Sequence, residues 1–112
     1  MELEPEVRQW IDSLPVSDFG TVVFHIDRLA TNGAALRMPH SRSLGDGLFE
    51  LRFDLGRVSQ RITFYFAPDR RIVLLTTFRK QRSNERPEVA RARRAMERCV
   101  AEGHEVDEEE ER

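Results

Sequence analysis

The chain of 112 residues contains little cysteine and no long apolar stretch. Its single cysteine, Cys99, cannot form a disulfide within the chain, so we expect a reducing compartment. The three histidines are scattered without the spacing of a zinc site, and we expect no metal and no cofactor. No apolar run approaches the roughly 18 residues of a membrane span, and the N-terminus lacks the basic-then-apolar pattern of a signal peptide. The sequence therefore predicts a cytoplasmic protein with no membrane partner.

Charge is distributed very unevenly along the chain, although the formal net charge is only −2. Residues 1–36 hold two arginines against six acidic residues, and residues 99–112 hold one arginine against seven. Residues 37–98 hold fifteen cations against seven acidic residues, and fourteen of these cations are arginines. The planar guanidinium group suits bidentate contacts to phosphate, so the basic middle of the chain predicts a polyanionic partner.

Apolar residues at helical spacing predict two helices in the first third of the chain. The first is expected over about residues 5–14. The second is expected to begin at residue 17 or 18 and to end at Asn32-Gly33, which supplies a left-handed stop. We expect the two helices to pack together as a hairpin.

The middle of the chain changes to the alternation that is typical of strands. After a predicted loop at residues 34–46, apolar and polar residues alternate over 49–55 and again over 61–66. A third strand, about residues 71–78, is apolar almost throughout, which favours a central position in the sheet. The polar positions of the first two strands are expected to face solvent.

The last part of the chain predicts one more helix and an acidic tail. The helix is expected over about residues 85–101 and is expected to end at Gly103. The acidic residues that follow cannot bury an apolar face and are expected to be disordered. The sequence thus predicts an α+β domain, residues 1–102, and a tail, residues 103–112. We expect an antiparallel sheet of three or four strands, with two N-terminal helices on one side and a C-terminal helix completing the core.

Cations gather on the expected solvent face of the strands and directly after the last strand. Arg52 and Arg61 are predicted to lie on adjacent antiparallel strands, where opposite side chains come within about 5.5 Å. The segment that follows the third strand adds Arg79, Lys80 and Arg82. Loops at the ends of buried strands commonly carry functional residues, so these side chains predict a cationic binding surface.

Three segments resemble the HigB-type toxins of the RelE/ParE superfamily. They read LRMPHSRSLGDGLFELR at residues 36–52, RITFYF at 61–66 and IVLLTTFRK at 72–80. The resemblance extends over about residues 7–100 and implies a RelE-like fold. It also implies the toxin of a type II toxin-antitoxin system, a ribosome-dependent mRNA endonuclease that inhibits translation. Its partners would be the ribosome, mRNA and a HigA-like helix-turn-helix antitoxin that holds it inactive.

The resemblance places the reacting groups on the strands and just after them. It implies that Arg61 binds the phosphate and that Lys80 is the cation after the last strand. Attack of a ribose 2′-hydroxyl on the adjacent phosphate needs cations and a group that moves protons, but no metal. The candidate catalytic residues are Arg52, Arg61, Lys80, Glu50 and His40. The candidate RNA-binding residues are Arg37, Arg42, Arg79 and Arg82.

The chain departs from the RelE-like pattern in two places. The pattern has a tyrosine near the start of the last helix, whereas residues 84–89 contain none. Glu50, His40 and Tyr65 are then the candidate bases. The pattern also opens with a strand before the first helix, and only residues 1–4 are available here for it, so the sequence leaves open whether the sheet has this edge strand.

Other interpretations stay open at this point. Glu50 and Arg61 could be an ordinary surface ion pair. The same superfamily includes ParE-like gyrase inhibitors, and a basic domain can bind nucleic acid without cutting it. A cation-lined face suits RNA better than an apolar protein interface, which argues against the gyrase inhibitor. Single-strand binders usually offer several stacking aromatics, and the basic segment offers only Tyr65 outside its expected core, which argues against a passive binder.

Overall fold

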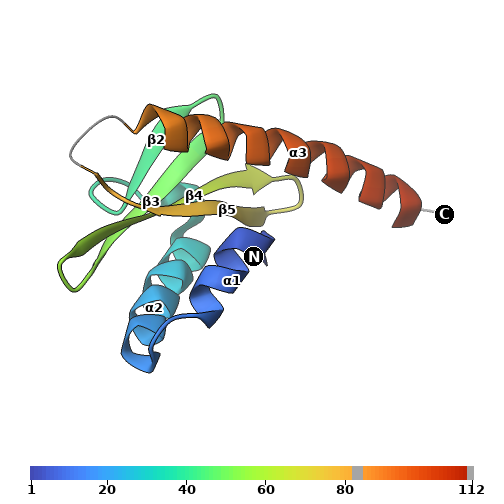
Figure 1. Cartoon of the computed structure of the whole chain (residues 1–112). Coiled ribbons are helices and arrows are strands. Elements are labelled where there is room, and N and C mark those ends of the chain that lie inside the picture. Colours follow the sequence, from blue (N-terminus) through green and yellow to red (C-terminus); the bar gives the residue numbers. More distant parts are fainter. Residues whose placement is uncertain (82–84, 111–112) are drawn as a thin grey trace.

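The computed structural model describes residues 1–81 and 85–110, with the surroundings of side chains described as far as residue 103. These parts of the chain form a five-stranded sheet and three α-helices (Figure 1). The elements are β1 (Glu2–Leu3), α1 (Pro5–Asp12), α2 (Val16–Asn32), a short 3-10 helix (Gly33–Ala35), β2 (Ser41–Gly45), β3 (Leu48–Leu55), β4 (Val58–Ala67), β5 (Arg71–Arg79) and α3 (Arg86–Glu110). No helix among the described residues has the length and apolar character needed to cross a membrane.

The strands lie in the order β1-β5-β4-β3-β2. Strand β1 runs parallel to β5, whereas every other pair is antiparallel, so the sheet is mixed. The α+β class is confirmed, but the predicted count of three or four strands is wrong. An N-terminal edge strand is present, because two residues suffice to pair Glu2 with Val73 and Leu3 with Leu74. A strand of two residues is too short to show an alternating pattern.

Two further strand predictions need correction. Strand β2 lies inside the predicted loop, and its polar residues and mostly exposed pattern hide it from a search for alternation. The centre of the sheet is β4, since β5 has only the two-residue β1 on its other side. The apolar run of β5 reflects helices on both faces of the sheet rather than a central position.

Helices cover both faces of the sheet (Figure 1). Helices α1 and α2 lie on one face, and α3 lies across the other. The first core contains Val7, Val22, Leu29, Leu51, Ile62, Phe64 and Leu74, and the second contains Leu48, Tyr65, Val73, Leu75, Ala92 and Ala95. The C-terminal helix therefore builds a second core instead of completing the first.

This arrangement changes the surroundings of the polar positions on β3 and β4. The side of the strands that alternation assigned to solvent lies partly under α3. Glu50 is 1% exposed and Arg61 is 5% exposed, and Tyr65 is also buried. A clean alternation of apolar and polar residues marks one wet face only in a sheet that is covered on one side. The prediction that these three side chains point to solvent is therefore wrong.

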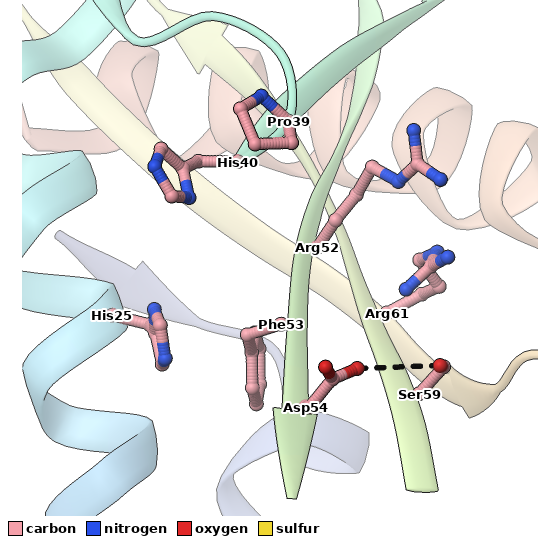
Figure 2. Close-up of a pocket in the computed structure, with 8 residues that line it drawn as sticks. All are labelled: His25, Pro39, His40, Arg52, Phe53, Asp54, Ser59 and Arg61. Carbon is pink, nitrogen blue, oxygen red and sulfur yellow. Dashed lines mark hydrogen bonds between the residues drawn. The ribbon is translucent and has the colours of Figure 1, made fainter.

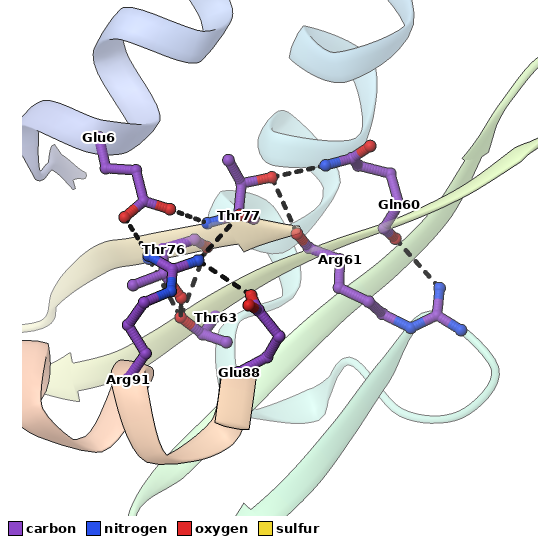
Figure 3. Close-up of polar contacts among 8 residues, drawn as sticks. All are labelled: Glu6, Gln60, Arg61, Thr63, Thr76, Thr77, Glu88 and Arg91. Carbon is purple, nitrogen blue, oxygen red and sulfur yellow. Dashed lines mark hydrogen bonds and ion pairs between the residues drawn. The ribbon is translucent and has the colours of Figure 1, made fainter. Parts of the chain in front are cut away.

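A polar network fastens α3 to the opposite side of the molecule. Arg91 pairs with Glu6 of α1 and with Glu88 in its own helix, and it donates to the carbonyl of Thr77 (Figure 3). The Thr77 N–H donates to Glu6 Oε2 at 2.9 Å. Helix α3 continues through Gly103 to Glu110, so the prediction that Gly103 ends it is wrong. The division into a domain and a tail stays a prediction.

Candidate functional site

A pocket of about 440 Å³ opens at the sheet edge where the pairing of β2 with β3 ends (Figure 2). It is lined by His25, Pro39, His40, Arg52, Phe53, Asp54, Ser59 and Arg61. Figure 2 shows β3 running between two sides of the pocket. The rings of His25, His40 and Phe53 lie on one side, and the two arginines lie with Asp54 and Ser59 on the other. The volume falls within the range of about 300–1,000 Å³ that small-ligand sites occupy.

The pocket brings together three of the predicted catalytic residues, His40, Arg52 and Arg61, and the two arginines lie on neighbouring strands. They are register partners across β3 and β4, as the sequence predicted. Arg61 Nε lies 3.2 Å from Glu50 Oε2, and its Nη1 donates to the carbonyl of Gln60 at 3.1 Å. The predicted Glu50–Arg61 ion pair therefore exists, but it is buried rather than on the surface.

Arg52 differs from Arg61 in having no carboxylate partner within the described residues. The side chain is half-buried, and its Nη1 donates to the sulfur of Met38 at 3.2 Å. A thioether is a weak acceptor, so this contact leaves the guanidinium charge largely uncompensated. Arg52 is therefore the arginine in the pocket that is best placed to meet an anionic ligand.

Glu50 lies behind the two arginines with an unusual electrostatic environment. Burial raises its pKa above the ordinary value, the Glu85 carboxylate raises it further, and Arg61, Arg52 and Arg42 act in the opposite direction. Its Oε1 is buried and has no hydrogen-bond partner within the described residues. A carboxylate with one orphaned oxygen and a raised pKa is suited to taking up a proton.

His40 is held in one orientation by a contact that the sequence did not suggest. Arg28 donates to His40 Nε2 at 3.2 Å and to His25 Nδ1 at 2.6 Å. An arginine can only donate, so His40 Nε2 must accept, and the proton of a neutral ring lies on Nδ1. His40 Nδ1 can therefore donate a hydrogen bond into the pocket, while Nε2 is occupied by Arg28.

His25 completes this cluster from α2. Its ring stacks on Phe53 with a centroid distance of 4.8 Å and an interplanar angle of 16°. Burial lowers the pKa of His25, and Arg28 and His40 lower it further. Sequence analysis did not single out either His25 or Arg28 as a site residue. The only sequence signal was that His25 and Arg28 are three residues apart on one predicted helix. This spacing is compatible with a contact between them, but it does not indicate a contact with His40.

The remaining predicted residues lie outside this pocket. Tyr65 is buried against α3 and burial raises its pKa, so it is excluded as a base. Lys80 and Arg79 line a separate hollow of about 370 Å³ with Arg57, Val58, Ser59 and Gln81. Arg37 is exposed before β2, and Arg42 is exposed on β2 opposite Glu50. Arg82 lies outside the described residues. Within the described part of the chain, no group of three or more His, Cys, Asp or Glu side chains could hold a metal ion.

The fold and the pocket define a small α+β protein with two arginines facing each other at a sheet edge. Residues 9–99 match the family model described as phage-derived protein Gp49-like (DUF891). The chain belongs to this family, which is a RelE/HigB-type toxin family of toxin-antitoxin systems. A search of curated proteins found no match.

Proposed function

We propose that this protein is the toxin of a type II toxin-antitoxin system and that it cleaves mRNA on the ribosome without a metal. Membership of a RelE/HigB-type toxin family supports the first part. The second part depends on one observation, the pairing of Arg52 with Arg61 beside the buried carboxylate of Glu50. Cations and a proton acceptor are what a 2′-hydroxyl attack on phosphate requires.

In this proposal the ribose 2′-oxygen attacks the adjacent phosphorus, and its proton passes to Glu50 by way of one water molecule, because Glu50 is buried behind the arginines that line the pocket. A bond forms between phosphorus and the 2′-oxygen, and the bond from phosphorus to the 5′-oxygen breaks. The products are a 2′,3′-cyclic phosphate and a 5′-hydroxyl, which takes its proton from solvent. Arg52 and Arg61 stabilise the charge that develops on the phosphate oxygens. His40 orients the phosphate by a hydrogen bond from Nδ1, and is not the base.

The partner in this proposal is an antitoxin of the HigA-like helix-turn-helix class. Family membership supports an antitoxin partner, whereas its class rests on the resemblance of the sequence to HigB-type toxins. Co-expression of the neighbouring gene should restore growth if that gene encodes the antitoxin. A protein with no helix-turn-helix pattern that restores growth would contradict the class but not the partnership.

The direct test is cleavage of mRNA on programmed ribosomes, with mapping of the new ends. We expect fragments with a 5′-hydroxyl and a 2′,3′-cyclic phosphate, formed in the presence of a chelator. The Glu50→Gln variant keeps the size of the side chain but removes the proton acceptor, and it should bind ribosomes and fail to cut. If the wild-type protein binds programmed ribosomes but no new mRNA ends are found, the protein is a ribosome-binding protein and not a nuclease.

A further inference from the structure

The hollow around Lys80 is a second cationic site with its own structural basis. Arg57 comes from the turn between β3 and β4, and Arg79 and Lys80 come from the end of β5. The Lys80 N–H donates to the carbonyl of Ser59 at 2.8 Å, and Arg79 pairs with Gln60 in the sheet register. These backbone contacts hold the three cationic residues around one concave surface.

Among the described residues, no carboxylate pairs with these three cations. None of the six described residues that line the hollow is acidic. Within the described residues, Arg57, Arg79 and Lys80 form no ion pair, and their side chains are exposed. Three like charges around one hollow repel each other, and a bound anion would relieve that repulsion. Arg61, by contrast, has a carboxylate partner in Glu50.

The hollow adjoins the pocket that holds Arg52 and Arg61. Ser59 lines both cavities, and its hydroxyl donates to Asp54 at 3.3 Å on the pocket side. Figure 2 shows Ser59 beside Arg61 on β4. A polyanion that occupies the pocket can therefore continue past Ser59 into the hollow without leaving the protein surface.

We propose that Arg57, Arg79 and Lys80 form a second phosphate-binding site, which holds RNA beside the cleavage pocket. This inference rests on the proposed function and assigns Lys80 to RNA binding rather than to the reaction. It also adds Arg57, which the resemblance did not indicate. The ligand is a phosphodiester of RNA, and the strand can be the mRNA itself or ribosomal RNA next to it.

The test compares Arg57→Gln and Lys80→Gln with a matched control, Arg70→Gln. Arg70 is an exposed arginine in the turn between β4 and β5, so the control removes the same charge elsewhere. Binding is measured against salt with a short single-stranded RNA that carries 2′-deoxy substitutions to block cleavage. Each site variant should reduce the slope of log affinity against log salt by about 0.7 for one lost phosphate contact. The control should keep the wild-type slope.

A second arm measures single-turnover cleavage at saturating protein. We expect the control Arg70→Gln to cut at the wild-type rate, whereas Arg52→Ala should lose about 100-fold and Arg57→Gln and Lys80→Gln should each lose far less than Arg52→Ala. A loss from Lys80→Gln as large as that from Arg52→Ala would overturn the inference, because the hollow would then take part in the reaction. Unchanged slopes for both site variants, in free RNA and on ribosomes, would also overturn it.

Two further outcomes are informative. One identifies which RNA supplies the phosphate, and the other tests the phosphate site independently of the proposed nuclease function. Weaker binding to ribosomes without mRNA, together with unchanged binding to the free RNA, supports the site and identifies ribosomal RNA as its ligand. If the wild-type protein does not cleave, but the salt slope still depends on Arg57 and Lys80, the phosphate site stands and the proposed nuclease function fails.

Discussion

Arg52 and Arg61 face each other directly across β3 and β4, so two positive charges share one cross-strand position. Like charges directly opposite each other destabilise a sheet. Glu50 pairs directly with Arg61 Nε at 3.2 Å, whereas Arg52 interacts with Glu50 only at longer range and donates its hydrogen bond to the sulfur of Met38. The protein therefore holds one arginine fixed by a buried carboxylate beside a second arginine that is available for an anion.

The first prediction separates these two arginines. Arg52→Ala should lower the single-turnover cleavage rate by about 100-fold or more, the scale of losing one donor to a developing oxyanion. It should not lower the thermal stability, because it removes a repulsion and leaves no buried charge unpaired. Arg61→Ala should lower both, with a loss of about 3–5 kcal/mol in the free energy of unfolding, since it leaves Glu50 buried without a partner. If Arg52→Ala and Arg61→Ala lowered the free energy of unfolding equally, Arg61 would not be the arginine that compensates Glu50.

The second prediction concerns the pH dependence of cleavage. The pKa of Glu50 is raised, so its carboxylate begins to take up protons above the ordinary pKa of 4.5. The logarithm of the rate should fall with decreasing pH from that raised value downwards, since a protonated base cannot accept the 2′-hydroxyl proton. A profile whose acid limb lies at or below pH 4.5 would exclude Glu50 as the base.

The same raised pKa predicts an effect on stability. A group whose pKa is higher in the folded state favours folding below its unfolded pKa, and that contribution is lost as the pH rises through the folded pKa. Glu50→Gln should therefore gain stability relative to wild type as the pH increases from 4 towards neutral. Thermal melts of both proteins across this range would show the difference, and a constant difference would argue against the raised pKa.

The second residue that gives a pH prediction is His25, whose pKa is lowered by burial. In the folded state the ring resists protonation, so its contribution to stability is complete above the unfolded pKa of about 6.5. That contribution is lost as the pH falls from there towards the lower folded pKa. The His25→Asn variant should melt with a weaker pH dependence than wild type between pH 7 and 5. Parallel melting curves would mean that His25 is not coupled to folding.

The last prediction distinguishes a translation inhibitor from a gyrase inhibitor in cells. Inducing the chain without its antitoxin should stop growth, and pulse labelling should show methionine incorporation falling before thymidine incorporation. The Glu50→Gln variant should leave both unchanged. If thymidine incorporation falls first and the DNA-damage response is induced, the protein acts like the ParE branch of the superfamily.

Sequence patterns located most of the helices and strands because the apolar residues that face a core recur at the spacing of a helix or of a strand. The strands β3, β4 and β5 were predicted within a few residues of their bounds, and Gly33, with a φ of 52°, ends α2 as expected. The pattern could not show which face of the sheet α3 would cover. Small residues such as Ala92 and Ala95 fit either face, and that choice decides whether Glu50 is wet or buried.

The candidate site was predictable to the extent that it follows from strand pairing. Alternation placed Arg52 and Arg61 on the same face of adjacent antiparallel strands, and the structure shows that the two residues are register partners, with Arg61 buried rather than facing solvent. The division between pocket and hollow was not predictable, because Lys80 and Arg52 are brought to their places by different strands. The spacing of His25 and Arg28 on α2 is compatible with their contact, but the contact of Arg28 with His40 depends on how the segment after α2 folds back, which helical spacing does not encode.

Arg28 connects an exposed side chain on α2 with two histidines that line the pocket. The guanidinium that holds His25 and His40 also lies over the ring of Phe24, at 5.3 Å from its centroid. Phe24 is 62% exposed on α2, the same helix that carries His25 into the pocket. A change at this exposed ring would therefore reach both histidines of the pocket through a single side chain, Arg28.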